Sequence, residues 1–273
     1  PIDVQEILDA EPMIKNPEQG ITETNNEGTL EFENVTFVYP DGEEPVIKNV
    51  SFSAKKGETI AFIGSTGSGK STLINLIPRF YDVTEGSIRI DGIDVRKFNL
   101  KALRKKIGFI RQKNLLFTGT IKSNIKFGKP HATHDEVENS AKIAQAYDFI
   151  TTKEKGFDEP ISEGGSNVSG GQKQRLSIAR ALVRKSEIYI FDDSFSALDF
   201  KTDAILRKAL KKETKDAIVL IVAQRIGSIM DADKIIVLDE GKVVGVGKHK
   251  ELLSTCNVYH EIALSQLTEE ELA

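Results

Sequence analysis

The sequence predicts an α/β fold, in which a mostly parallel sheet flanked by helices carries an antiparallel β subdomain near its N-terminus and a helical insertion. Three uninterrupted apolar runs, at residues 187–191, 217–222 and 234–238, are typical of parallel strands that are buried on both faces. A helical pattern at residues 201–212 separates the first two runs. Residues 113–184 are instead charged and helical in pattern, with few strand candidates, and form the predicted insertion.

The remaining elements follow in an order that fits this architecture. A β-like pattern begins at Leu30 and predicts two strands joined across residues 40–42, and a short strand follows at residues 87–90. Within the insertion, the pattern predicts helices at residues 120–127, 133–145 and 171–183. From His249 onward the chain predicts a pair of amphipathic helices.

The composition is that of an ordinary globular domain, with 39% hydrophobic and 29% charged residues among 273. Residues 1–28 are acidic and irregular and contain three prolines, so we expect a linker from an upstream segment, followed by a domain at residues 29–273. The net charge of −4 gives no electrostatic reason to expect nucleic acid as a partner. The longest apolar run, residues 217–223, is too short to cross a bilayer. A single cysteine, Cys256, excludes an intrachain disulfide and fits a reducing compartment.

A phosphate-binding loop is predicted between an apolar strand at residues 59–63 and a helix at residues 72–77. The loop matches G-x-x-x-x-G-K-[ST], and this strand–loop–helix context argues against a chance glycine-rich turn. Its backbone N–H groups and the helix N-terminus would hold an anion. Lys70 would reach the β- and γ-phosphates, and the Ser71 hydroxyl would ligate Mg²⁺. The predicted binding residues are Gly64, Ser65, Thr66, Gly67, Ser68, Gly69, Lys70, Ser71 and Thr72. The chain is therefore expected to bind a nucleoside triphosphate.

Two further motifs point to the same chemistry. The strand at residues 187–191 ends in Asp192 and Asp193, where the first carboxylate would hold Mg²⁺ through water and the second would polarise an attacking water. In isolation, a solvated turn would explain this pair equally well. The run 168–175 places a serine and two glycines at the start of a long helix, which is a second anion-binding helix N-terminus or an ordinary N-cap. A head-to-tail dimer would need two such phosphate cradles on each chain.

Taken together, these motifs resemble the nucleotide-binding domain of an exporter-type ATP-binding cassette (ABC) transporter, over residues 29–267. The loop at residues 64–71 resembles the family's Walker A motif, and Asp192 closes a Walker B strand. The signature motif Leu-Ser-Gly-Gly-Gln is similar to the run 168–172, with valine first. The resemblance implies a P-loop NTPase core that binds ATP and Mg²⁺ at the cytoplasmic face of the membrane. It also implies two partners, a second nucleotide-binding domain and the transmembrane domains of the same transporter. The signature residues that would contact the partner's nucleotide are Ser169, Gly170, Gly171 and Gln172.

The same resemblance assigns further roles. Tyr39 stands where the family stacks an aromatic ring on adenine, and Gln112 matches the Q-loop glutamine that ligates Mg²⁺ and reports to the membrane domains. Asp199 ends a D-loop that crosses to the other subunit. The exporter X-loop lies at residues 162–165, with Gly164 in place of an expected arginine.

Two positions depart from the hydrolytic pattern of the family. Glutamate is expected where this chain has Asp193, and histidine where it has Gln224. A shorter carboxylate would sit too far back to orient water, and an amide cannot carry a positive charge. We therefore expect Asp193, Gln224 and Gln112 to form a site that binds ATP but hydrolyses it poorly, in a heterodimer with a different, competent subunit. An active homodimer, a regulatory module and a cassette ATPase outside transport remain alternatives.

A few other residues invite interpretation. His131 and His134 flank a predicted helix start, where Thr133 as N-cap is a simpler explanation than a metal site. His249 is expected to cap a helix. Phe80 and Tyr81 are equally consistent with a core position and with a groove that receives a transmembrane helix.

Overall fold

The structure, a computed structural model, describes residues 14–113 and 115–272, and its central feature is a six-stranded sheet. In spatial order the strands are β12 (Lys242–Gly247), β11 (Lys234–Asp239), β3 (Thr59–Gly64), β10 (Ile218–Val222), β9 (Ile188–Asp192) and β6 (Ile107–Ile110). All neighbours pair in parallel except β11 and β12, which are antiparallel. The predicted, mostly parallel α/β sheet is confirmed.

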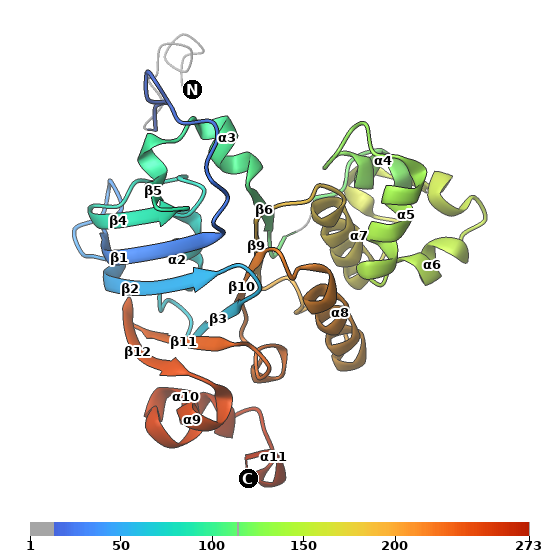
Figure 1. Cartoon of the computed structure of the whole chain (residues 1–273). Coiled ribbons are helices and arrows are strands. Elements are labelled where there is room, and N and C mark those ends of the chain that lie inside the picture. Colours follow the sequence, from blue (N-terminus) through green and yellow to red (C-terminus); the bar gives the residue numbers. More distant parts are fainter. Residues whose placement is uncertain (1–13, 114, 273) are drawn as a thin grey trace, which may run out of the picture.

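A second, antiparallel sheet covers one side of this core (Figure 1). Its strands, in spatial order, are β2 (Ile47–Lys55), β1 (Thr29–Phe37), β4 (Glu85–Ile90) and β5 (Ile93–Asp94). The period-two pattern explains β1, since Leu30 and Phe32 are buried whereas Glu31 and Glu33 are exposed. The antiparallel β subdomain is thus confirmed.

The helical insertion lies between β6 and β9 in the chain and on the opposite side of the molecule from β1, β2 and β4 (Figure 1). Its helices are α4 (Ile121–Lys126), α5 (His134–Ile143), α6 (Tyr147–Thr151) and α7 (Gly170–Val183), and a small sheet pairs β7 (Gly119–Thr120) with β8 (Pro160–Ile161). Thr120 and Thr133 begin α4 and α5 with capping boxes, in which side chain and backbone satisfy each other's end groups. Both α4 and α5 pack on α7.

The other helices connect the strands or close the C-terminal end. They are α2 (Lys70–Asn75), α3 (Leu100–Lys105), α8 (Phe200–Glu213), α9 (His249–Thr255), α10 (Asn257–Leu264) and α11 (Glu269–Leu272), and short 3₁₀ turns occur at Val95–Lys97, Gly156–Asp158, Glu163–Gly165 and Ile226–Ser228. None of the helices in the part of the chain that the structure describes is long and apolar enough to span a membrane.

The hydrophobic core of the described residues forms two clusters, one on each face of the six-stranded sheet. Strand β3 shows why, because Ala61 and Ile63 join the cluster beneath the helices whereas Ile60 and Phe62 join the cluster beneath the antiparallel sheet. A strand covered on both faces needs apolar residues at every position. This explains the uninterrupted apolar runs of the sequence.

The N-terminal segment is attached to the domain by hydrogen bonds. The N–H of Ile21 donates to the carbonyl oxygen of Lys97, and the N–H of Gly28 donates to Asp91. Of the predicted linker at residues 1–28, the first thirteen residues lie outside the described residues, as do position 114 of the insertion and the last residue. The domain boundaries remain predictions.

The structure decides the role of His249, and it places Phe80 and Tyr81 between the two predicted positions, core and surface groove. His249 does not cap α9: its side chain is buried and its Nδ1 lies 2.6 Å from the hydroxyl of Tyr259, so the pair joins α9 to α10. Phe80 and Tyr81 are both half-buried, and Phe80 packs against Phe109.

Candidate nucleotide-binding site

The phosphate loop connects β3 to α2, and the structure requires glycine at two of its positions. At Gly64, an added Cβ would lie 2.2 Å from the carbonyl oxygen of Leu238, so no side chain fits. Gly69, with φ of 103°, is the N-cap of α2 and supplies no side-chain cap. The first N–H groups of the helix are therefore left for another acceptor, which suits a phosphate.

Lys70 points its ammonium group back into this loop. Its Nζ donates to the carbonyl oxygens of Gly64 at 2.6 Å and Ser65 at 3.0 Å, and to the hydroxyl of Ser68 at 3.2 Å. Burial lowers the pKa of Lys70, while the nearby Asp193 and Asp192 act in the opposite direction. The loop thus holds one buried cation close to where it would hold an anion.

Two oxygen donors converge where a divalent cation would bind. The Ser71 hydroxyl donates to Oδ1 of Asp192 at 3.4 Å, although the two residues are 121 positions apart. Hydroxyl and carboxylate oxygens suit Mg²⁺, which also keeps waters and takes phosphate oxygens as ligands. No group of three or more His, Cys, Asp and Glu side chains suited to a metal occurs among residues 14–113 and 115–272. The donor set therefore fits Mg²⁺ bound together with a nucleotide.

Strand register brings Gln112 to Asp193. Because Ile110 of β6 pairs with Phe191 of β9, the residues two positions further on emerge side by side. Gln112 Nε2 donates to Asp193 Oδ2 at 3.1 Å. The backbone of Asp193 is in the left-handed region with φ of 50°, and its N–H donates to the carbonyl oxygen of Val222 at 2.7 Å. Asp193 is thereby held between two strands at the carboxyl edge of the sheet.

Burial raises the pKa of both Asp192 and Asp193, and the charge of Asp192 adds to the increase at Asp193. A carboxyl whose pKa is higher in the folded than in the unfolded chain stabilises the fold below its ordinary pKa, and this contribution is lost as the pH rises through the raised value. The fold thus opposes the ionisation of these two neighbouring carboxyls, which is a cost often found at functional sites.

Asp192→Asn is accordingly expected to stabilise the nucleotide-free chain, and to do so more at pH 7 than at pH 4. A gain of about 1 kcal/mol would raise the melting temperature by roughly 2–4 °C. Thermal unfolding at the two pH values measures this difference, and exposed Asp41→Asn serves as the control. Equal shifts at both pH values would contradict the assigned burial cost.

Tyr39 lies beside the phosphate loop. Its hydroxyl is 2.7 Å from the hydroxyl of Thr72, and its ring packs edge-on against Phe37 and Tyr81. The ring is half-buried. The structure thus brings Tyr39 to the first turn of α2, next to the predicted phosphate-binding residues.

The signature residues begin α7 in a different part of the molecule. Ser169 is the N-cap and forms a capping box with Gln172, and both Ser169 and Gly170 are exposed. Figure 1 shows α7 grouped with α4, α5 and α6, apart from α2. The predicted binding residues therefore fall into two groups, one around Lys70 and one around Ser169.

The last two candidates lie on loops near Asp193. Gln224 is exposed, its backbone opposes the rise in the pKa of Asp193, and its carbonyl oxygen accepts from Gln266 Nε2 at 2.7 Å. Asp199 is the N-cap of α8, and hydrogen bonds from the backbone N–H and hydroxyl of Thr202 lower its pKa. The sequence analysis did not predict that Asp199 caps α8, although an Asp directly before a helical pattern is a cap signal.

The sequence analysis assigned no role to two arginines that lie beside Gln112 and Gln224. Arg111 lies over the rings of Phe80 and Phe109, next to Gln112. Arg225 follows Gln224 and forms an ion pair with Asp203, which is 2% exposed. Both arginines stand in motif runs of the sequence, but their contacts with residues far away in the chain could not be read from those runs.

Comparison with known proteins agrees with this geometry. A family model described as ABC transporter matches residues 47–196. Proteins of Staphylococcus aureus strains NCTC 8325 and COL, with the provisional name multidrug export ATP-binding/permease protein, are 44% identical over 95% of this chain. The alignment covers 45% of each, so the chain spans a little under half the length of these relatives.

A solved structure shares the whole fold. The structure of a bacterial Atm1-family ABC exporter with ATP bound superposes with a TM-score of 0.92 at 34% sequence identity, covering 97% of this chain and 47% of the other. The family match, which includes the phosphate loop and Asp192, covers more than half of the chain. The chain therefore belongs to the ABC transporter family.

Proposed function

We propose that this chain is the ATP-binding domain of an ABC exporter, which binds Mg-ATP in a head-to-tail dimer and couples ATP binding and hydrolysis to export. The family match and the names of the relatives support this function. Residues 29–273 would form the domain, with a helical subdomain at 113–184, and residues 1–28 would link it to transmembrane domains. The domain would then work at the cytoplasmic face of the cell membrane.

The separation of two half-sites is the observation that carries the proposal. Lys70 and the uncapped N-terminus of α2 would bind the phosphates of one nucleotide, and Ser71, Gln112 and Asp192 would hold Mg²⁺. When bound, Mg²⁺ would neutralise charge on the phosphates. Ser169 and Gly170 are exposed at the start of α7, so they could close over the nucleotide of a second domain.

The chain's own site is proposed to hydrolyse ATP weakly. Asp193 has one methylene less than glutamate, and its carboxylate already accepts a hydrogen bond from Gln112. Gln224 is neutral and cannot give or take a proton as histidine does. The partner would then be a different subunit with a competent site, completed by Ser169–Gln172 of this chain.

The alternative is an active homodimer, and the pKa of Asp193 favours it. A general base works best when its pKa lies near the working pH, and the pKa of Asp193 is raised by burial and by Asp192. The two functions differ in one measurable quantity, the ATP turnover of this chain by itself.

A groove between the sheet and the insertion supports docking of transmembrane domains. Its volume is about 280 Å³, and its lining includes Phe109, Leu115 and four positively charged side chains, Arg111, Lys113, Arg180 and Arg184. The guanidinium of Arg180 lies over the rings of Phe117 and Phe127, and Phe127 is 64% exposed. The ion pairs among the described residues include none of these four side chains, and an exposed apolar rim around such positive charge suits a helix with apolar and acidic side chains. We propose that an intracellular segment of the transporter binds here.

The signature motif offers a matched test. Ser169→Ala and Thr133→Ala each remove the side chain of a capping box, so each is expected to cost about 1 kcal/mol of stability. Only Ser169→Ala is expected to lower ATP turnover, by about 10-fold, because a hydrogen bond to a charged group is worth about 1.5–3 kcal/mol. Turnover is measured on the mixed dimer or on a chain made competent by Asp193→Glu and Gln224→His. Equal turnover for both variants would contradict the role of Ser169.

A further inference from the structure

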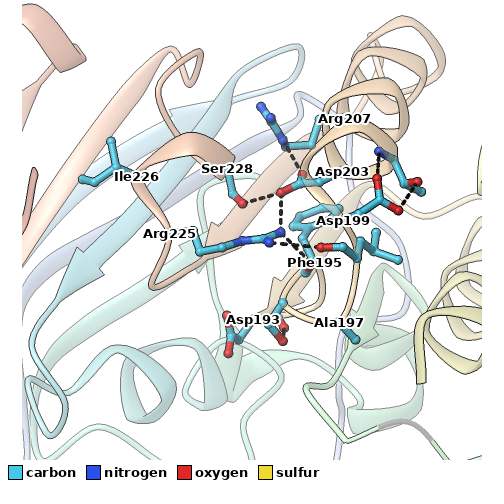
Figure 2. Close-up of polar contacts among 12 residues, drawn as sticks. Asp193, Phe195, Ala197, Asp199, Asp203, Arg207, Arg225, Ile226 and Ser228 are labelled. Atoms are coloured by element: carbon cyan, nitrogen blue, oxygen red, sulfur yellow. Dashed lines mark hydrogen bonds and ion pairs between the residues drawn. The ribbon is translucent and has the colours of Figure 1, made fainter. Parts of the chain in front are cut away.

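The loop that follows Asp193, residues 194–199, is attached to the domain from two sides. On one side, the N–H of Ala197 donates at 3.2 Å to the side-chain oxygen of Gln174, a buried residue of α7. On the other, the guanidinium of Arg225 donates to the carbonyl oxygens of Phe195 at 2.7 Å and Leu198 at 3.0 Å (Figure 2). The loop therefore touches both the helix that begins with the signature motif and the segment that carries Gln224.

A buried carboxylate holds Arg225 in this position. Asp203, in the first turn of α8, accepts from Arg225 at 2.7 Å, from Arg207 at 2.6 Å and from the hydroxyl of Ser228 at 2.6 Å (Figure 2). Its side chain is 2% exposed, so its charge depends on these partners. Two arginines thus share one buried carboxylate, but only Arg225 also reaches the loop.

The contacts of Arg225 connect two groups of proposed site residues. Arg225 directly follows Gln224, and both the backbone of Gln224 and the charge of Arg225 act to lower the pKa of Asp193. The loop that Arg225 holds directly follows Asp193 and ends at Asp199. At Gly171 an added Cβ would lie 3.2 Å from the carbonyl oxygen of Ala197, so the start of α7 lies directly against the same loop.

We propose that Asp203 and Arg225 are a positioning pair, which links the signature half-site of this chain to its own phosphate-loop half-site. A second domain that presses on α7 or on Asp199 would shift the loop at residues 194–199. Arg225 would carry that shift to Gln224 and Asp193. Asp203 would hold the guanidinium of Arg225 in the orientation that these contacts need. The pair touches no nucleotide and acts through the loop. The inference rests on the proposed dimer function for its consequence in turnover.

The geometry requires arginine at position 225. One nitrogen, Nη1, serves Leu198, while the other, Nη2, serves both Phe195 and Asp203. A lysine ammonium keeps the charge but cannot span these acceptors with a planar fork. Arg225→Lys therefore removes the hydrogen bonds to the loop at residues 194–199, while its positive charge still compensates the charge of Asp203.

The matched control is Arg207→Lys. Arg207 donates to the same carboxylate at 2.6 Å and approaches Asp231, but it has no contact with the loop in the described hydrogen bonds and ion pairs. The two variants and Asp203→Asn are compared by hydrogen–deuterium exchange of peptides covering residues 194–199 and 223–226. ATP turnover is measured in whichever background is active, the unmodified chain or the Asp193→Glu, Gln224→His variant.

We expect faster exchange across residues 194–199 in Arg225→Lys and Asp203→Asn and not in Arg207→Lys. We also expect kcat to fall about 10-fold or more in the first two variants with KM for ATP changed less than about 2-fold, because the loop does not form the phosphate site. The double variant Asp203→Asn, Arg225→Lys should lose no more than the worse single variant, since the two act as a unit.

Three results would overturn the inference: an equal loss of kcat in Arg207→Lys, additive losses in the double variant, or unchanged exchange of the loop in Arg225→Lys. If neither background hydrolyses ATP, the proposed ATPase function fails instead. The exchange measurement, which needs no turnover, then still decides whether Arg225 holds the loop.

Discussion

Replacing Asp193 with glutamate and Gln224 with histidine is expected to raise ATP turnover by this chain about 10²-fold. A well-placed general base contributes about 10²–10⁴-fold to such reactions, and a small displacement of it loses much of that factor. The added methylene would extend the carboxylate beyond its contact with Gln112. The imidazole would supply a side chain that can carry a positive charge beside the γ-phosphate.

The single variants separate the two contributions. Asp193 has a backbone φ of 50°, a conformation that aspartate tolerates better than glutamate, so Asp193→Glu is expected to lower the melting temperature slightly. Each single variant should give only part of the gain, because the side chains at positions 193 and 224 are proposed to act at the same γ-phosphate. Phosphate release at saturating Mg-ATP measures turnover. If the unmodified chain already matches the double variant, the weak-site proposal is wrong and the active homodimer is correct.

Lys70→Ala is expected to abolish the stabilisation of the chain by Mg-ATP. A ligand at 100 times its Kd stabilises the folded state by about 2.7 kcal/mol, which corresponds to a rise of roughly 5–11 °C in the melting temperature for a domain of this size. Lys70 is the buried cation of the phosphate loop, and its ammonium group donates to the carbonyl oxygens of Gly64 and Ser65. Without it the β- and γ-phosphates would lie near Asp192 and Asp193 with less compensating charge.

The measurement is thermal unfolding across a titration of Mg-ATP. Exposed Lys212 in the last turn of α8 provides the control, since Lys212→Ala removes the same charge far from the loop. We expect the unmodified chain and Lys212→Ala to show the same concentration-dependent rise, and Lys70→Ala to show none. A full rise in Lys70→Ala would place the nucleotide elsewhere.

Local patterns were sufficient where the fold depends on local chemistry. The apolar runs of β9, β10 and β11 and the helices that begin at Thr120, Thr133 and Ser169 followed from periodicity and capping residues. By contrast, β6 was not predicted, because its four residues include Gly108 and carry no strand pattern of their own. It is a strand because it pairs with β9. The edge strand β12 was missed as well, since half of its alternating residues are exposed.

In the candidate site, too, features made of neighbouring residues could be predicted, whereas contacts between distant residues could not. The phosphate loop could be identified from sequence because its function resides in consecutive residues, whose backbone N–H groups all face one anion. The contacts between Gln112 and Asp193, and between Arg225 and Asp203, join residues 81 and 22 positions apart. His249 was assigned a cap by resemblance to a family position, but its side chain pairs with Tyr259 on the next helix.

The sequence by itself therefore determined the α/β architecture, the phosphate loop and the family, because each depends on residues that are close together in the chain. Only the tertiary structure decided which side chains meet at Asp193 and which charges hold the loop at residues 194–199. Such contacts depend on the register of paired strands and on the packing of helices against them. These are properties of the folded chain as a whole.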